Sequence, residues 1–322
     1  MATTAQAAGP AAKGRAGAVR PKSGLGVRTT SILLTVVINA LLIFGVFLTA
    51  APYVYMVAAT FKPNSEIWSW PLTFYPKTLA NPDLYPGQVA RVLGFIPLYL
   101  ENYRYLFEVL PFWRWTFNSF YMAITRSLLG IFLSALAGFA FAKYQFRLKK
   151  IGFLLVLLSL MLPFQVLLTP LFIEMARLKW LNTYTGIIVP FAASPFFIFL
   201  MRQYMLTVPD ELLDAARIDG CSEFGLFWRV VAPIQKPAFG ILGILAFNSA
   251  WNDYLWPLIV LQDKMLYTVN LGIAVLYGPY DTPFGTILAG SFLNTLPIVL
   301  VFLLLQRYFV AGLTAGALKG VA

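Results

Sequence analysis

Histidine is absent from this chain of 322 residues, and cysteine occurs only once, at Cys221. These absences exclude Cys/His zinc sites and the Cys–His and Ser–His arrangements of nucleophilic enzymes, so we expect no metal site and no catalytic residues. The phosphate-binding patterns GxGxxG after a strand and GxxxxGK followed by Ser or Thr are also missing. We therefore expect the chain to bind no nucleotide or other cofactor itself and to be no enzyme.

Charged residues are scarce as well, at 11% of the chain, whereas a soluble domain has about 25%. Hydrophobic residues make up 59%, which indicates an integral membrane protein surrounded by lipid. The formal net charge is +11. This excess does not require a nucleic-acid partner, because Lys and Arg collect in the cytoplasmic loops of membrane proteins.

Six apolar stretches have roughly the 20 residues needed to cross a bilayer. The first runs from Ile32 to Ala59 without a charge, which is too long for a signal peptide, so we expect it to be retained. The predicted spans are 32–59, 115–142, 151–173, 180–201, 237–262 and 282–306. Kinks are expected at the prolines within them, which are Pro163, Pro170, Pro190, Pro195, Pro257 and Pro297.

The distribution of cations predicts the orientation of these spans. With the N-terminus inside, the cytoplasmic segments hold fifteen Lys and Arg residues and the external segments hold eight. The turn AKYQFRLKK, residues 142–150, weighs most because it is short. The sequence therefore predicts an all-α polytopic protein of the cell (inner or plasma) membrane, with six transmembrane helices and cytoplasmic N- and C-termini.

These predictions divide the chain into five parts. The parts are a disordered basic cytoplasmic tail (1–28), the first transmembrane helix (29–60), an external cap (61–112), a core of five helices with a cytoplasmic loop at 207–236 (113–310), and a cytoplasmic C-terminal tail (311–322). The cap is rich in proline and aromatic residues. This composition favours a small packed structure with short helices, such as one at 101–109, over a flexible linker.

The segment LLDAARIDGCSEFGLFWRVVAPI, residues 212–234, is a charged helix–turn–helix between apolar spans. Thr207 and Asp210 fit a capping box at the start of its first helix. Gly220 fits a left-handed stop after that helix, and Ser222 fits the N-cap of the second.

The second helix of this segment carries three aromatic residues that share one face at α-helical spacing: Phe224, Phe227 and Trp228. Ala215 and Ala216 make the first helix thin enough for close approach. From the residues alone two interpretations remain open. The segment is either an amphipathic turn on the membrane surface, with its aromatic residues in lipid, or a surface that docks on a partner.

The segment resembles the EAA loop of ABC-transporter permease subunits, in which Glu-Ala-Ala is followed by three residues, Gly, nine residues and Ile-x-Leu-Pro. The matching residues here are Asp214, Ala215, Ala216, Gly220, Val230, Val231, Ala232 and Pro233. The chain departs from the pattern by Asp for Glu, Val for Ile and Ala for Leu.

Further stretches resemble permeases of the maltose-permease type, the second permease subunits of carbohydrate importers. They are FKPNSEIWSWP, FNSFYMA, RLKWLNTYTGIIVP, SAWNDYLWPLIVL and LQRYFVAGLTAGALKG. The resemblance covers nearly the whole chain after the tail, although the stretch around 77–97 is longer than is usual for the family.

The resemblance implies three kinds of neighbour besides lipid: a second permease subunit, two cytoplasmic ATPase subunits that bind ATP and Mg²⁺, and an extracytoplasmic sugar-binding protein. It also implies that the loop docks on an ATPase subunit. The residues expected to carry this coupling are Asp214, Ala215, Ala216, Gly220, Phe224, Phe227, Trp228 and Pro233. The external loop 263–283 would contact the binding protein, and Gly312–Gly320 would reach towards the ATPases.

Two charges lie within predicted spans, Arg126 in the second and Asp253 in the fifth. Such charges are costly and usually face a protein interior or a water-filled cavity. One interpretation is an ion pair, between these two residues or across subunits. The other is a polar lining of the sugar path, in which Trp251 and Tyr254 offer aromatic faces and Asn252 offers hydrogen bonds beside Asp253.

The sequence thus predicts the permease subunit of a binding-protein-dependent ABC importer for an oligosaccharide or disaccharide, working by ATP-driven alternating access. An importer for amino acids or polyamines is the alternative within this class. An ion-coupled secondary transporter, with Asp253 and Arg126 as a relay, is the alternative from another class. The lack of evident inverted repeats argues against that second alternative.

Overall fold

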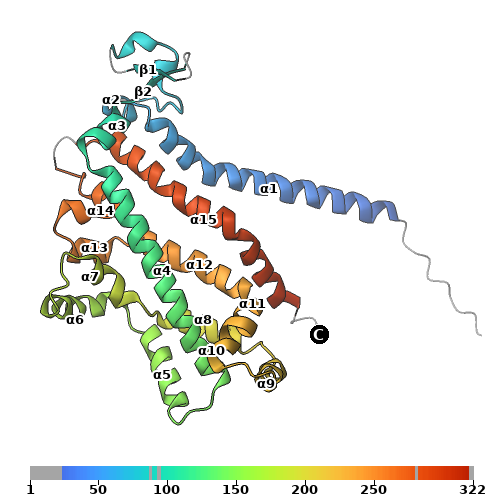
Figure 1. Ribbon diagram of the computed structural model, residues 1–322. Coiled ribbons are helices and arrows are strands. Elements are labelled where there is room, and N and C mark those ends of the chain that lie inside the picture. Colours follow the sequence, from blue (N-terminus) through green and yellow to red (C-terminus); the bar gives the residue numbers. More distant parts are fainter. Residues whose placement is uncertain (1–23, 87–88, 93–95, 280–281, 319–322) are drawn as a thin grey trace, which may run out of the picture. The chain divides into compact units, whose positions relative to one another are not determined.

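The computed structural model describes residues 24–86, 89–92, 96–279 and 282–318, and within these ranges the chain is mostly helical (Figure 1). It divides into two compact units between Tyr53 and Val54. Helix α1 (Gly24–Ala59) makes up the described part of the first unit and enters the second with its last residues. All other described elements belong to the second unit.

Helix α1 is apolar on all sides, and the side chains described along it are mostly exposed. A helix of this kind needs lipid or another protein around it. The helix begins at Gly24, so residues 24–28 are helical and not part of a disordered tail. The remainder of that predicted tail, residues 1–23, lies outside the described residues.

The core of the second unit is a bundle of four helices: α4 (Phe112–Lys143), α8 (Pro195–Met205), α12 (Lys236–Trp251) and α15 (Phe284–Leu318). Helix α4 packs on α8 and α12, and α12 packs on α15. At Gly138 of α4, an added Cβ would lie only 2.7 Å from the Cβ of Met201 on α8. Small residues at such contacts are typical of membrane helices, because close backbone packing is their main source of attraction.

Three described helical segments are long and apolar enough to cross a membrane by themselves: Leu34–Ala59, Phe112–Lys143 and Phe284–Arg307. Three pairs of helices meet the same criteria only together, and their bends are 105°, 41° and 84°. The chain therefore has up to six spans by length and composition, if each bent pair counts as one.

Of the predicted kinks, those at Pro163 and between Pro190 and Pro195 are confirmed as breaks between helices, whereas Pro170, Pro257 and Pro297 lie inside continuous helices. The predicted span 151–173 consists of α5 (Lys149–Leu160) and α6 (Phe164–Arg177), which meet at 105° beside Pro163. The predicted span 180–201 is likewise divided into α7 (Tyr184–Ile188), the 3-10 turn η4 (Val189–Phe191) and α8. Proline lacks the amide hydrogen that a continuous helix needs at these positions.

The predicted span 237–262 is interrupted as well. Helix α12 ends at Trp251, and α13 (Leu255–Val260) begins only after three non-helical residues. The shorter elements that follow are η6 (Lys264–Leu266) and α14 (Val269–Ala274), before α15 closes the chain. Helix α15 continues to Leu318, so residues 311–318 of the predicted C-terminal tail are helical.

The predicted external segment is packed, as its composition indicated. Its elements are α2 (Asn64–Ile67), η1 (Lys77–Leu79), η2 (Pro82–Leu84), β1 (Val89–Val92), β2 (Ile96–Tyr99), α3 (Glu101–Arg104) and the π-helix η3 (Tyr105–Val109). The short helix predicted at 101–109 is confirmed by α3 and η3. The all-α prediction missed the antiparallel ribbon, in which Val89 pairs with Tyr99 and Val92 with Ile96.

Buried polar residues hold this segment together. Lys62 is fully buried and donates a hydrogen bond to the carbonyl oxygen of Thr73, and burial lowers the pKa of its ammonium group. Asn102 Nδ2 donates to the carbonyl oxygens of Thr60 and Lys62, both at 2.8 Å. Asn64 accepts a hydrogen bond from Gly285 N at 3.0 Å, which joins the segment to the start of α15.

Candidate functional site

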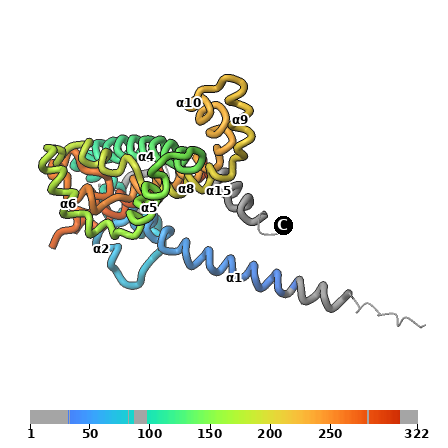
Figure 2. Tube along the Cα trace, turned by 90° about the horizontal axis from the view of Figure 1, so that it is seen from below, coloured from blue at the N-terminus to red at the C-terminus, as the bar shows by residue number. Residues whose placement is uncertain are grey.

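The predicted loop at 207–236 extends from the end of the bundle (Figure 2). It contains α9 (Asp210–Ile218), α10 (Glu223–Gly225), the π-helix η5 (Leu226–Val231) and α11 (Ala232–Ile234). Gly220 has a φ of +82°, and Ser222 caps α10 by accepting a hydrogen bond from Gly225 N at 3.2 Å. The predicted order of helix, left-handed glycine and capped helix is therefore confirmed.

The predicted capping box is wrong. Pro209 is the N-cap of α9, and no side chain caps that helix. The Thr207 hydroxyl donates instead to the carbonyl oxygen of Tyr204 at 2.8 Å and accepts from Gln235 Nε2 at 3.2 Å. The Thr207 hydroxyl is thus engaged by Tyr204 and Gln235 instead of α9, and the carboxylate of Asp210 is drawn to another helix.

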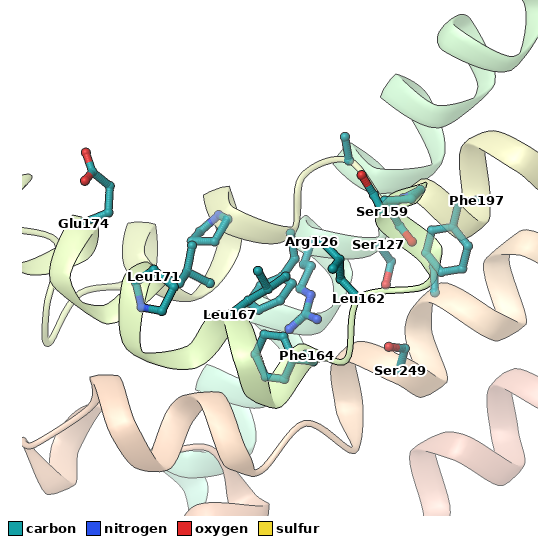
Figure 3. A pocket seen from close by; sticks show the side chains of 17 residues that line it. Arg126, Ser127, Ser159, Leu162, Phe164, Leu167, Leu171, Glu174, Phe197 and Ser249 are labelled. Atoms are coloured by element: carbon teal, nitrogen blue, oxygen red, sulfur yellow. The ribbon is translucent and has the colours of Figure 1, made fainter. Parts of the chain in front are cut away.

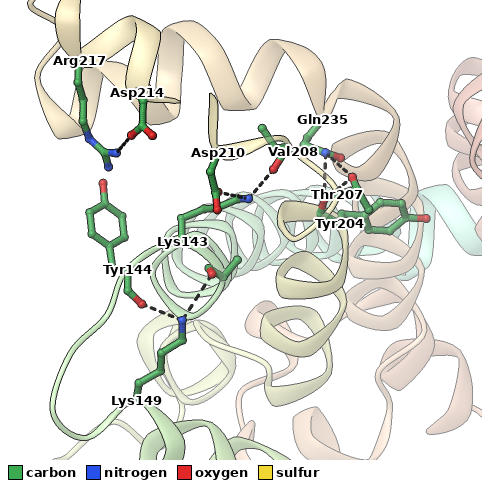
Figure 4. Close-up of polar contacts among 11 residues, drawn as sticks. Lys143, Tyr144, Lys149, Tyr204, Thr207, Val208, Asp210, Asp214, Arg217 and Gln235 are labelled. Atoms are coloured by element: carbon green, nitrogen blue, oxygen red, sulfur yellow. Dashed lines mark hydrogen bonds and ion pairs between the residues drawn. The ribbon is translucent and has the colours of Figure 1, made fainter. Parts of the chain in front are cut away.

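That other helix is α4, whose C-terminal end anchors the loop (Figure 4). Lys143 is the last residue of α4, and its side chain is only 6% exposed. Its Nζ atom donates to Asp210 Oδ1 at 2.7 Å and also to the carbonyl oxygen of Val208. The amine therefore binds the chain on both sides of Pro209 and fixes the start of α9 against α4.

A second contact anchors the other half of the loop. The Tyr144 hydroxyl donates a hydrogen bond to the carboxylate of Glu223. Arg217 bridges the two halves, because its Nε donates to Glu223 Oε1 at 3.0 Å and its Nη1 lies 2.9 Å from Asp214 Oδ1. The loop is thus held in one conformation by side chains of α9, α10 and the end of α4.

These contacts favour the ionised form of two of the loop's carboxylates. Arg217, and then Tyr144, lower the pKa of Glu223, and Lys143 lowers the pKa of Asp210. Desolvation, followed by the hydrogen bond to Glu223, raises the pKa of Tyr144 to about 12. Lys143 and Tyr144 were not among the predicted site residues. Their sequence signal was the cationic turn 142–150, which we used only to predict orientation.

The three predicted aromatic residues do not share one exposed face. Phe224 is 61% exposed and Trp228 is 44% exposed, with 6.1 Å between their ring centroids. Phe227 is 1% exposed and packs on Phe139 of α4, at a centroid distance of 5.5 Å. The reason is the wider turn of the π-helix η5. It keeps Trp228, four residues after Phe224, on the same face as Phe224, and it rotates Phe227, three residues after Phe224, away from that face. Phe227 is therefore part of the core.

The remaining predicted coupling residues lie at the surface. Asp214, Ala215, Gly220 and Pro233 are exposed, and Ala216 is half-buried. A hollow of about 500 Å³ beside Gly220 is lined by Phe224, Trp228 and their neighbours. Ile218, which the sequence analysis did not single out, is 87% exposed at the end of α9. Apolar side chains gathered on a fixed, projecting loop are typical of a docking surface.

The predicted contact between the two intramembrane charges is present. Arg126 Nη1 lies 2.6 Å from Asp253 Oδ2, and the two side chains are 13% and 16% exposed. Arg126 is on α4, and Asp253 lies in the break between α12 and α13. The guanidinium carbon also lies 3.9 Å from the ring centroid of Phe191. The pair therefore joins three elements of the bundle.

The four residues predicted to line the sugar path are not brought together as a lining. Trp251 is 2% exposed, its Nε1 donates to the carbonyl oxygen of Asn294 at 3.0 Å, and its ring packs on Phe120. Its role is structural, which corrects the prediction of an aromatic face for the sugar. Asn252 is exposed but donates to the carbonyl oxygen of Asn248 on its own helix, and Tyr254 is 40% exposed.

A cavity of about 840 Å³ lies on another side of Arg126 (Figure 3). Its polar lining comes from Arg126, Ser127, Ser159, Glu174, Ser194 and Ser249. Phe164, Phe191 and Phe197 contribute aromatic rings. Of these residues only Arg126 was singled out from the sequence, because the cavity brings together residues from α4, α5, α6, α8 and α12 that no local pattern connects.

The sequence matches the family of binding-protein-dependent transport system inner membrane components over residues 130–315, which is more than half of the chain. The chain therefore belongs to this family. This region includes the projecting loop, most of the four-helix bundle and the lining of the cavity except Arg126 and Ser127. The protein is a helical transport permease and not an enzyme.

Three similar proteins extend the match to nearly the whole chain. The arabinooligosaccharides transport system permease protein AraQ of Halalkalibacterium halodurans is 38% identical, over 91% of this chain and 99% of that protein. The lactose transport system permease protein LacG of Rhizobium radiobacter is 34% identical, over 85% and 93%. The sn-glycerol-3-phosphate transport system permease protein UgpE of Escherichia coli is 35% identical, over 87% and 96%.

A solved structure shares the fold. It is the crystal structure of a bacterial ABC transporter involved in the import of the acidic polysaccharide alginate, and one of its chains matches with a TM-score of 0.72 and 18% sequence identity. The match covers 90% of this chain and 99% of that chain. The bent helices and the projecting loop therefore belong to a fold that is already known in an ABC transporter.

Proposed function

We propose that this chain is one of two permease subunits in a binding-protein-dependent ABC importer for an oligosaccharide or disaccharide. The observation that carries the proposal is the projecting loop, whose exposed apolar residues are fixed to the end of α4 by Lys143 and Tyr144. A rigid surface of this kind can receive force from a partner. The sugar class is supported by the substrates named for the similar proteins AraQ and LacG.

The partners in this proposal are a second permease subunit, two cytoplasmic ATPase subunits that bind ATP and Mg²⁺, and an external sugar-binding protein. The docking residues on this chain are Asp214, Ala215, Ala216, Gly220, Ile218, Phe224, Trp228 and Pro233. Docking is favoured over a turn lying in lipid, because the charged residues Asp214, Arg217 and Glu223 lie on the same loop as the exposed aromatic residues. These charges would be costly to bring into hydrocarbon.

The test is uptake by proteoliposomes that contain the complete importer. We expect radiolabelled arabinotriose or lactose to accumulate only under two conditions together. ATP and Mg²⁺ must be supplied on the side of the ATPase subunits, and the loaded binding protein on the opposite side. An imposed proton gradient without ATP should give no accumulation. Gradient-driven uptake by the two permease subunits alone would instead establish the ion-coupled secondary transporter.

The proposed orientation places the loop and both termini in the cytoplasm. A cysteine introduced at Lys149, in a Cys221→Ser background, should react with an impermeant thiol reagent only from the cytoplasmic side. A cysteine at Asn81 should react only from outside. The turn at Lys149 and the external segment at Asn81 lie on opposite sides of the predicted second span, so labelling of both from one side would refute this orientation.

A further inference from the structure

The cavity beside Arg126 has the dimensions and lining of a ligand site. Its volume of about 840 Å³ falls within the range of roughly 300–1,000 Å³ found for small-molecule pockets. Four serine side chains and three phenylalanine rings line it, together with Arg126 and Glu174 (Figure 3). Hydroxyl groups and aromatic rings suit a sugar, which presents both hydroxyls and C–H faces.

Arg126, the cation in the wall of this cavity, already forms an ion pair. Asp253 lies 2.6 Å from Arg126 Nη1, and Phe191 covers one side of the guanidinium plane. A guanidinium has five N–H donors, and the contact with Asp253 is made by Nη1 alone. Arg126 therefore offers hydrogen-bond donors to the cavity without offering a free positive charge.

Ser127, the next residue on α4, is the second distinctive group. It is 6% exposed and lines the cavity, and its Oγ atom has no hydrogen-bond partner among the described residues. An unsatisfied buried hydroxyl is unfavourable. If the Ser127 side chain turns toward the cavity, its hydroxyl can pair with a ligand hydroxyl without first breaking another hydrogen bond. Ser159, by contrast, already donates to the carbonyl oxygen of Leu155 at 2.8 Å.

The other charge in the lining is also paired. Glu174 Oε2 lies 3.6 Å from Arg177 Nη1. A carboxylate or phosphate that entered the cavity would lose its hydration and meet no free cation there, which is strongly unfavourable. A neutral polyol would lose only hydrogen bonds that Ser127, Arg126 and the other serines can replace.

We infer that this cavity is a subsite for a neutral saccharide, and that the Arg126–Asp253 pair makes it reject anionic sugars. The inference rests on the proposed function as a sugar importer and adds the charge class of the substrate. It predicts that this chain does not carry an anionic substrate such as the sn-glycerol-3-phosphate for which a protein 35% identical to it is named. Arg126 and Ser127 are the specificity-determining residues.

The test measures the reactivity of a cysteine placed in the cavity of the complete importer. Ser249 is exposed and lines the cavity, so Ser249→Cys is introduced in a Cys221→Ser background with cysteine-free partners. Asn248→Cys is the matched control, because Asn248 is its neighbour on α12 and lines a different hollow with Ile244 and Phe247. Labelling rates are measured with neutral and anionic methanethiosulfonate reagents.

Lactose and arabinotriose should slow the labelling of Ser249→Cys about threefold when present at twice their Kd, while leaving the control unchanged. Lactobionate and galacturonate oligosaccharides should give no protection. In the purified fraction of importer that still assembles, adding Asp253→Asn should make the anionic reagent react about tenfold faster, because an unpaired cation attracts an anion strongly in a medium less polar than water. Ser127→Ala, which leaves the ion pair intact, should weaken protection by lactose about fivefold.

Equal protection by anionic and neutral sugars would overturn the inference, as would equal protection of both cysteines. A Ser249→Cys that reacts with no reagent in an importer that still transports sugar would also overturn it, because the second permease would then cover the cavity. None of these results affects the proposed function. That proposal fails only if ATP drives no uptake of any saccharide.

Discussion

Replacing Gly220 with valine is expected to reduce ATP-driven import by more than about tenfold while leaving the chain inserted in the membrane. Gly220 has a φ of +82°, at which a β-branched residue is strained. An added Cβ would meet no atom within 4 Å, so the effect arises from the backbone and not from a collision. A changed turn would misplace α9 against α10 and alter the surface that we propose docks on an ATPase subunit.

Gly220→Asn is the matched control, because asparagine tolerates the left-handed conformation far better than valine. It should retain most of the import activity. Trp228→Ala tests the same surface without touching the backbone, and truncating an aromatic residue at an interface can cost about 2 kcal/mol or more of binding free energy. Phe227→Ala is unsuitable for this purpose, because Phe227 is 1% exposed and its loss would disturb the core.

The measurements are ATP hydrolysis and sugar uptake by the reconstituted importer, with and without loaded binding protein. Gly220→Val and Trp228→Ala should lose the stimulation of ATP hydrolysis by the binding protein, while sugar binding to that protein stays normal. Wild-type rates in both variants would show that the loop does not couple this chain to an ATPase. The loop would then be a helix at the membrane surface.

Neutralising either member of the Arg126–Asp253 pair is expected to impair assembly or transport severely. Asp253→Asn and Arg126→Gln each leave a charge without its partner, and breaking a buried pair in this way typically costs about 3–5 kcal/mol. The two side chains are 13% and 16% exposed, so solvent compensates little of that loss. The double variant should recover part of the function, because it leaves no unpaired charge.

Membrane abundance of the assembled complex and initial uptake rates distinguish the outcomes. Partial recovery in the double variant supports an ion pair that joins α4 to the break after α12. If the loss of function in the double variant equals the sum of the two single losses, the two residues act independently, contrary to the contact of 2.6 Å. Phe191→Leu is a useful companion, since it removes the ring that stacks on Arg126 and keeps the ion pair.

Features fixed by local physics could be predicted from the sequence. Gly220 and Ser222 have the conformations that their residue types favour, and the break beside Pro163 follows from the missing amide hydrogen. The contact of Arg126 with Asp253 was also foreseeable, because two opposite charges in apolar spans have few other ways to be stabilised.

Features that depend on packing between distant segments could not be predicted. The π-helix at Leu226–Val231 reverses the exposure of Phe227, and an α-helical projection of the sequence cannot reveal this. Trp251 resembled a sugar-stacking residue until its indole was found bonded to Asn294 on α15. The hydroxyl of Ser127 became notable only once the cavity was assembled from five helices.

Helix α4 carries both Lys143, which anchors the loop, and Arg126, the cation in the wall of the cavity. Lys143 and Arg126 both belong to α4, which runs unbroken from Phe112 to Lys143, whereas the predicted spans 151–173 and 180–201 are bent. At 1.5 Å per residue they stand roughly 25 Å apart along its axis. If α4 moves as a rigid rod, a tilt of about 5° about its Lys143 end displaces Arg126 by roughly 2 Å over that length. A displacement of that size would break the 2.6 Å contact with Asp253, so under the proposed function a movement of the ATPase at the loop would change the wall of the cavity.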